Sequence, residues 1–111
     1  MRTDALRSAL RELPAREREE GDRLFAAKAY RSHAPGPNLV GGVSAIVNVH
    51  DAAAGRWYDV HIDEDDEGIL AGCTCPRRGL CAHLWTLLRC LEHQSWTRRE
   101  GEHPAWPHRA R

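Results

Sequence analysis

The chain has 111 residues, and its 16 Lys and Arg residues balance 16 Asp and Glu residues, so the formal net charge is zero. This length predicts one small domain with short arms and a modest hydrophobic core. No stretch approaches the ~20 apolar residues of a membrane span, and the first residues carry no secretory signal, so we expect a cytoplasmic protein outside the membrane. A neutral total argues against a uniformly basic coat for nucleic acid but leaves local patches open.

Residues 1–39 predict a helical, variable N-terminal segment. Leucines recur in its first part at helical spacing. They are Leu6, Leu10 and Leu13. Pro14 either interrupts this helix or opens a second one over residues 15–31, where Gly21 is unfavourable and the last residues could instead belong to a strand. The leucine stripe either packs within the chain or is offered to a partner.

The period of the apolar residues changes after a loop that the Pro and Gly residues of Ala34–Asn38 predict. Apolar and polar residues alternate over residues 43–49 and again over residues 57–62, which is typical of strands with one buried face. Asp51–Gly55 separates the two runs as a short loop. We therefore predict a β-hairpin over residues 42–62.

Residues 63–68 predict an acidic turn, and residues 69–71 a short third strand. From residue 83 to about residue 95 the period is helical again, with one stripe of leucines. The stripe consists of Leu84, Leu87, Leu88 and Leu91. Residues 97–111 contain Pro, Gly and Arg without periodicity, so we expect a flexible, basic C-terminal tail.

Three of the four cysteines lie within nine residues, and a histidine follows them closely. These residues are Cys73, Cys75, Cys81 and His83. In a chain without an export signal, such cysteines favour a metal site over disulfides. A Cys-x-Cys pair in extended chain points both thiols to one side, and Pro76 and Gly79 let the chain turn back. Three thiolates and one imidazole form a complete tetrahedral set for Zn²⁺, which predicts a structural site.

This stretch resembles the SWIM zinc finger, in which Cys-x-Cys, a spacer and Cys-x-His follow one another. Cys73–Pro76 is similar to the opening of the family motif, and Gly79–Leu84 is similar to its closing run into a helix. The spacer of five residues is short for the family, and Ala82 stands where a Lys is frequent. The resemblance implies a zinc-stabilised interaction module that binds DNA or proteins and has no catalysis of its own.

The expected fold is therefore α+β. A small zinc-stabilised ββα domain, made of the β-hairpin, the zinc loop and the C-terminal helix, would occupy residues 40–96. Residues 1–39 would precede it as a helical segment, and residues 97–111 would follow as the tail.

The partner stays open between nucleic acid and protein. Residues 41–72 carry a net charge of −6 and residues 73–111 a net charge of +4, so an anionic partner would meet the second region. Its candidate nucleic-acid contacts are Arg77, Arg78, Arg89, Arg98 and Arg99. The alternatives are a merely solubilising arginine surface and an adaptor subunit of a DNA-processing complex that does not touch nucleic acid itself.

Three further hypotheses carry less weight. A metal-dependent hydrolase would need one ligand to leave the metal and make room for water. The acidic residues of Asp63–Gly68 partly resemble a calcium loop, but the Glu at its twelfth position is missing. Cys90 lies too far along the helix from His83 to bind the same ion, so we expect it to be a small buried residue.

Overall fold

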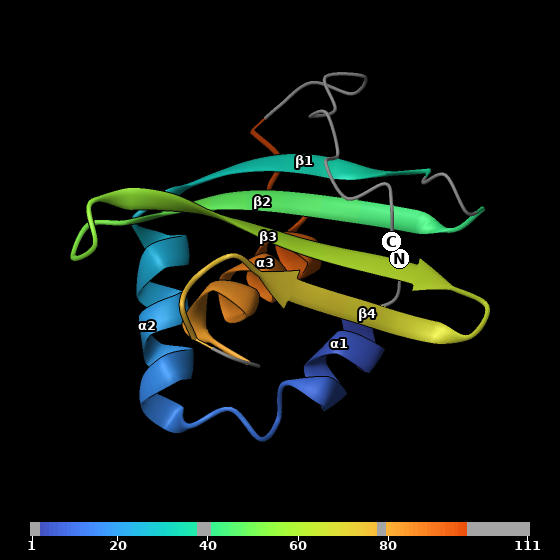
Figure 1. Ribbon diagram of the computed structural model, residues 1–111, viewed down its shortest axis with the longest axis horizontal. Coiled ribbons are helices and arrows are strands. Elements are labelled where there is room, and N and C mark those ends of the chain that lie inside the picture. The colour runs from blue at the N-terminus through green and yellow to red at the C-terminus, as the bar shows by residue number, and fades with distance from the viewer. Residues whose placement is uncertain (1–2, 38–40, 78–79, 98–111) are drawn as a thin grey trace.

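The computed structural model describes residues 3–37, 41–77 and 80–97, and this part of the chain folds into three helices and four strands (Figure 1). The helices are α1 (Thr3–Ala9), α2 (Ala15–Ala26) and α3 (Ala82–His93). The strands are β1 (Tyr30–Pro37), β2 (Val43–Asp51), β3 (Arg56–Asp65) and β4 (Gly68–Cys73). The α+β class is confirmed. None of these helices is long and apolar enough to cross a membrane.

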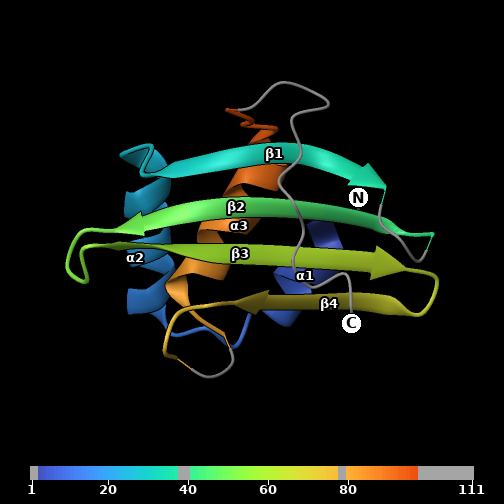
Figure 2. The same cartoon turned by 45° about the horizontal axis from the view of Figure 1, so that its top comes forward.

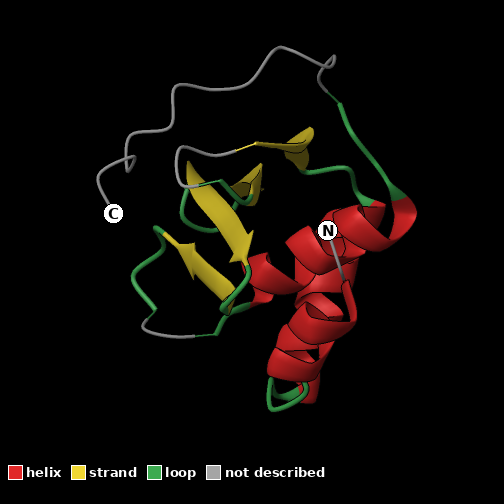
Figure 3. Cartoon of the chain, turned by 90° about the vertical axis from the view of Figure 1, so that its right-hand side faces the viewer, coloured by secondary structure: helices red, strands yellow, loops and turns green. Residues whose placement is uncertain are grey.

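The four strands form one antiparallel sheet in the order β1-β2-β3-β4, and the helices lie together on one of its faces (Figures 1 and 3). The predicted hairpin is its centre, with Val47 opposite Val60 and Ala45 opposite Ile62. β1 and β4 extend the hairpin on either side. β4 confirms the predicted third strand, and the sheet is wider than the ββα unit expected from the sequence because β1, from the expected N-terminal segment, also joins it.

The core lies between the sheet and the helices. The alternation along β2 and β3 is confirmed, since six apolar residues on the helix-facing side are buried and Val43, at the start of β2, is half-buried. The six buried residues are Ala45, Val47, Val49, Tyr58, Val60 and Ile62. All four leucines of the stripe on α3 are buried against them. Burial of these aliphatic and aromatic side chains, at about 1.5–3 kcal/mol each, is the main force that holds the two layers together.

The N-terminal leucines pack within the chain. Leu6 in α1, and Leu10 and Leu13 in the turn after it, are at most 3% exposed and belong to the same core cluster as the sheet. The Arg7 guanidinium also forms an ion pair with Glu92 of α3, at 2.5 Å. One core therefore joins residues of the expected N-terminal segment to those of the expected zinc domain.

The prediction of a loop at residues 34–38 is wrong for its described part, because β1 runs through Pro37. Likewise α2 ends at Ala26, and Tyr30 begins the strand. The register of the pairing between β1 and β2 shifts between His33 and Gly36, and Pro35 lies within this irregularity. An outer strand tolerates proline because an N–H directed away from the sheet is not needed there. The Pro and Gly residues of this segment, which favour a loop locally, therefore gave the wrong prediction for a segment that pairs as a strand.

Helix α2 approaches α3 closely at Gly21. A Cβ added at Gly21 would lie 2.6 Å from the Cβ of Trp85 and 2.7 Å from the carbonyl oxygen of Ala82. The Thr86 hydroxyl fixes the same crossing, because it donates to the Gly21 carbonyl at 3.1 Å. The glycine that weakened the helix prediction is thus required by helix packing.

We expect Gly21→Ala to lower the free energy of unfolding by about 1–3 kcal/mol, because the methyl group would push the helices apart. In an exposed helix the same change would stabilise by about 1 kcal/mol. Urea unfolding followed by circular dichroism measures the difference. Arg16→Ala at an exposed position of α2 is the control, and a Gly21→Ala protein as stable as the parent would contradict the close approach.

Candidate metal centre

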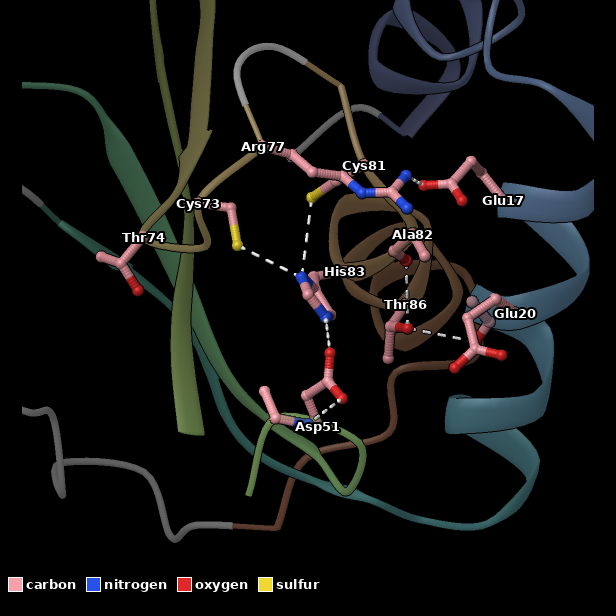
Figure 4. A network of polar contacts seen from close by, with 12 residues as sticks. Glu17, Glu20, Asp51, Cys73, Thr74, Arg77, Cys81, Ala82, His83 and Thr86 are labelled. Carbon is pink, nitrogen blue, oxygen red and sulfur yellow. Dashed lines mark hydrogen bonds and ion pairs between the residues drawn. The ribbon is translucent and has the colours of Figure 1, made fainter. Parts of the chain in front are cut away.

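The four expected ligands meet at the junction between β4 and α3, and Figure 4 shows three of them, Cys73, Cys81 and His83. Cys73 ends β4, and Cys75 lies two residues beyond it, after Thr74. Cys81 is the N-cap of α3 in an extended conformation, and His83 lies in the first turn of the helix. One ligand atom from each of the four lies within 4.8 Å of all the others. The described part of the chain thus contains a Cys₃His cluster that is compact enough to hold a metal ion.

The cluster is largely shielded from water. Cys75, Cys81 and His83 are buried, and Cys73 is half-buried. Cys75 and Cys81 also belong to the hydrophobic core between the sheet and the helices. A bound ion would therefore sit inside the protein and be bonded to the two layers at once.

The imidazole of His83 is oriented by contacts on both of its nitrogens. Its Nδ1 lies 3.5 Å from Sγ of Cys73 and 3.7 Å from Sγ of Cys81, whereas its Nε2 lies 3.6 Å from Oδ2 of Asp51 (Figure 4). The ring of Tyr58 packs beside it, with ring centroids 5.2 Å apart. Nδ1 therefore faces the sulfurs and is the ring atom that could bind a metal ion, whereas Nε2 faces a carboxylate, an arrangement common for histidines that bind metals.

Asp51 is the site residue that the sequence did not reveal. It ends β2, and its Oδ1 accepts a hydrogen bond from the backbone N–H of Ala54 in the following turn. This turn leaves Oδ2 on the side of His83. No spacing rule connects Asp51 to the cluster, because only the fold brings the two segments together.

The thiols of the cluster have strongly different acidities. The pKa of Cys81 is lowered, because its sulfur accepts a hydrogen bond from the Cys73 thiol and lies beside His83. The same hydrogen bond raises the pKa of Cys73, and burial raises that of Cys75. A metal ion that binds three thiolates displaces their protons, so metal affinity at such a cluster depends on pH.

The loop between β4 and α3 is attached to both neighbouring layers. The backbone N–H of Thr74 donates to the carbonyl of Asp59 at 3.0 Å, which continues the pairing of β4 with β3 beyond Cys73. On the other side, the Arg77 guanidinium forms an ion pair with the buried carboxylate of Glu17 in α2 (Figure 4). These contacts hold the first two ligands in place from the sheet side and the helix side.

Two of the five arginines expected to contact nucleic acid are described, and both form ion pairs within the chain. Arg77 is paired with Glu17, and Arg89 lies 3.2 Å from Asp22 and 3.4 Å from Glu92. The other three lie outside the described residues. They are Arg78, Arg98 and Arg99.

The remaining cysteine and the acidic turn do not join the metal centre. Cys90 is completely buried in the core, as expected, and this burial raises its pKa to about 12. In the turn between β3 and β4, Oδ1 of Asp65 accepts hydrogen bonds from the backbone of Glu67 and Gly68. Within the described ranges, the Cys₃His cluster is the only group of side chains close enough to hold a metal ion.

Comparison of the chain with models of protein families, with curated proteins and with solved structures finds no match. The functional assignment therefore depends on the cluster and its surroundings.

We expect Asp51→Asn to weaken zinc binding by about 10–100-fold, because the amide cannot accept the Nε2 proton of His83 as a carboxylate does. The asparagine Oδ1 still caps the turn at Ala54, so the fold should persist. Competition for zinc with a chromophoric chelator measures the affinity. Asp66→Asn, an exposed carboxylate in the acidic turn, is the matched control, and equal affinities of the two variants would show that Asp51 does not support the site.

Proposed function

We propose that this protein is a non-catalytic binding module of the SWIM zinc-finger type, organised by one structural Zn²⁺ at the Cys₃His cluster. The observation that carries the proposal is the convergence of the four ligand atoms within 4.8 Å of one another. Ligands of one tetrahedral zinc lie about 3.3–3.8 Å apart. The distances of 3.5 and 3.7 Å from Nδ1 of His83 to the two sulfurs agree with that spacing.

The composition of the cluster supports zinc and a structural role. Thiolate and imidazole ligands favour zinc over calcium or magnesium. Four protein ligands complete a tetrahedral shell, so no position is left for the water that a hydrolase would activate. The burial of Cys81 and His83 supports the same conclusion, because substrate could not approach the ion.

The SWIM assignment is supported by the order of the ligands and by their places in the fold. Cys73 and Cys75 follow the last strand of an antiparallel meander, and Cys81 and His83 begin the next helix. Zinc bound there would attach the end of β4 to the start of α3. Its binding energy of ~10–16 kcal/mol is similar to the whole stability of a small domain.

A protein is the favoured partner over nucleic acid. Binding to phosphates needs cationic side chains that are not already neutralised. Arg77 and Arg89 lie beside carboxylates of their own chain. The strands β2 to β4 and their turns also carry seven acidic residues against one arginine, and this net negative charge repels a phosphate backbone.

We expect one zinc per chain, with three sulfur ligands and one nitrogen ligand by X-ray absorption. Removal of the zinc by a chelator, or the variant Cys81→Ala, should abolish the cooperative thermal transition, because the junction of sheet and helix loses its bonds. Cys90→Ala is the control, since it removes a thiol outside the cluster. Unchanged circular dichroism and melting after verified removal of zinc would contradict a structural role.

We expect the zinc-loaded protein to show no binding to single- or double-stranded DNA or RNA at micromolar concentration and low salt. Fluorescence anisotropy measures this directly. The alternative of nucleic-acid binding would be supported by an affinity that falls with salt and is lost in the double variant Arg98→Ala/Arg99→Ala.

A further inference from the structure

Among the described residues, the outer side of β4 is an open sheet edge, and we infer that it binds an extended, basic segment of a partner protein as a fifth strand. This inference rests on the proposed function as a protein-binding module and adds the surface and the chemistry of the partner. The sheet order places β4 at one edge, and no described strand pairs with its outer side (Figure 2).

The backbone of β4 has hydrogen-bonding groups directed outward. The backbone N–H of Thr74 donates to the carbonyl of Asp59 on β3. In an antiparallel ladder, only every second residue directs its backbone N–H and C=O toward the same neighbouring strand. The N–H and C=O groups of Ile69, Ala71 and Cys73 therefore point away from the sheet. They form the row of donors and acceptors that an added strand requires.

The opposite edge of the sheet is already covered by the chain itself. The segment after α3 lies along β1, where the N–H of Thr97 donates to the carbonyl of Ser32 at 3.1 Å and the N–H of Ser32 donates to Oγ1 of Thr97 at 2.7 Å. Within the described ranges, β4 has no comparable cover. Among the described residues, the β1 edge is therefore covered, whereas the β4 edge is available to an added strand.

The sequence of β4 also lacks the usual protection of an edge strand. Natural edges carry charged residues or proline that prevent unwanted pairing. Residues 68–73 contain neither. Leu70 is 59% exposed on the face of the sheet away from the helices, between Gly68 and Gly72 on the same side. An uncharged edge with an exposed leucine is suited to an apolar side chain of an added strand.

The charge beside this edge decides the chemistry of the occupant. Residues 63–67 are all acidic. A shallow hollow at this end of β4 combines carboxylates with aliphatic side chains. Its lining consists of Asp63, Asp65, Glu67, Gly68, Ile69 and Leu70. Such a surface fits a Lys or Arg side chain, whose stem packs on leucine while its cationic end meets the carboxylates.

The same charges disfavour a second copy of this chain as the occupant. Antiparallel pairing of two β4 strands would place the acidic residues 63–67 of one copy near the metal centre of the other, where three thiolates and one divalent ion sum to about −1. Parallel pairing would bring the two acidic turns together. A basic strand from another protein avoids both repulsions.

The test measures the anisotropy of a short fluorescein-labelled peptide of alternating lysine and valine, added to the zinc-loaded protein at low salt. We expect saturable binding, and binding at least about tenfold weaker for a peptide of alternating glutamate and valine. A lysine–valine peptide with N-methyl groups on alternate residues should also bind at least about tenfold more weakly, because it cannot form the backbone ladder.

Variants of the protein test the edge itself. Ala71→Pro removes an outward N–H without removing a bond to β3, and should weaken binding about tenfold. Ala71→Ser keeps that N–H and should bind as the parent does. Glu67→Lys should weaken binding more than Glu19→Lys on the exposed side of α2. Zinc content and melting temperature of each variant verify the fold, and the N-methylated peptide tests the ladder even if Ala71→Pro does not fold.

Three results would overturn the inference. They are equal binding of the plain and N-methylated peptides, no binding by the folded parent protein, and a dimer of the parent that Ala71→Pro dissociates. A different measurement tests the proposed function. A protein that binds the peptide but keeps its fold after removal of zinc would contradict the structural role of zinc and would leave the inference about β4 intact.

Discussion

The junction between the end of β4 and the start of α3 is the contact on which the other features of the molecule depend. Cys73 comes from the sheet and His83 from the helix, and their ligand atoms meet in the buried space between the layers. The hydrophobic core brings these layers together without specifying direction, because apolar burial is non-directional. A metal ion held by the cluster would add directional bonds at one point, and Asp51 lies beside the imidazole on the side away from the sulfurs.

Although the total charge is zero, charged residues are arranged differently in the helical layer and in the sheet. On the helical side, arginines are paired across elements, as in the contacts of Arg7 with Glu92 and of Arg77 with Glu17. These pairs join α1 to α3 and α2 to the loop that carries the ligands. On the sheet side, acidic residues gather at the turn between β3 and β4, next to an uncharged strand. The unbalanced charge is therefore located beside the open edge rather than at the metal centre.

Gly21 and the prolines of β1 show how packing overrides local preference. Glycine is unfavourable inside a helix, yet α2 needs it because Trp85 and the carbonyl of Ala82 leave no space for a methyl group. Pro37 would ordinarily end a strand, yet β1 continues to it because it lies at the margin of the sheet, where one side of the backbone needs no partner strand. In both cases the reason lies in an element distant in sequence.

Features that depend on local periodicity and composition could be predicted from the residues alone. These are the alternating strands of the central hairpin, the leucine stripe of α3, and a ligand set whose spacing brings three thiols and one imidazole within reach of one ion. The contacts between residues far apart in the sequence became known only from the folded chain. There Asp51 lies beside His83, Arg77 pairs with Glu17, β1 joins the sheet, and no described strand pairs with the outer side of β4. Such contacts arise from strand register and helix packing, which no spacing along the chain encodes.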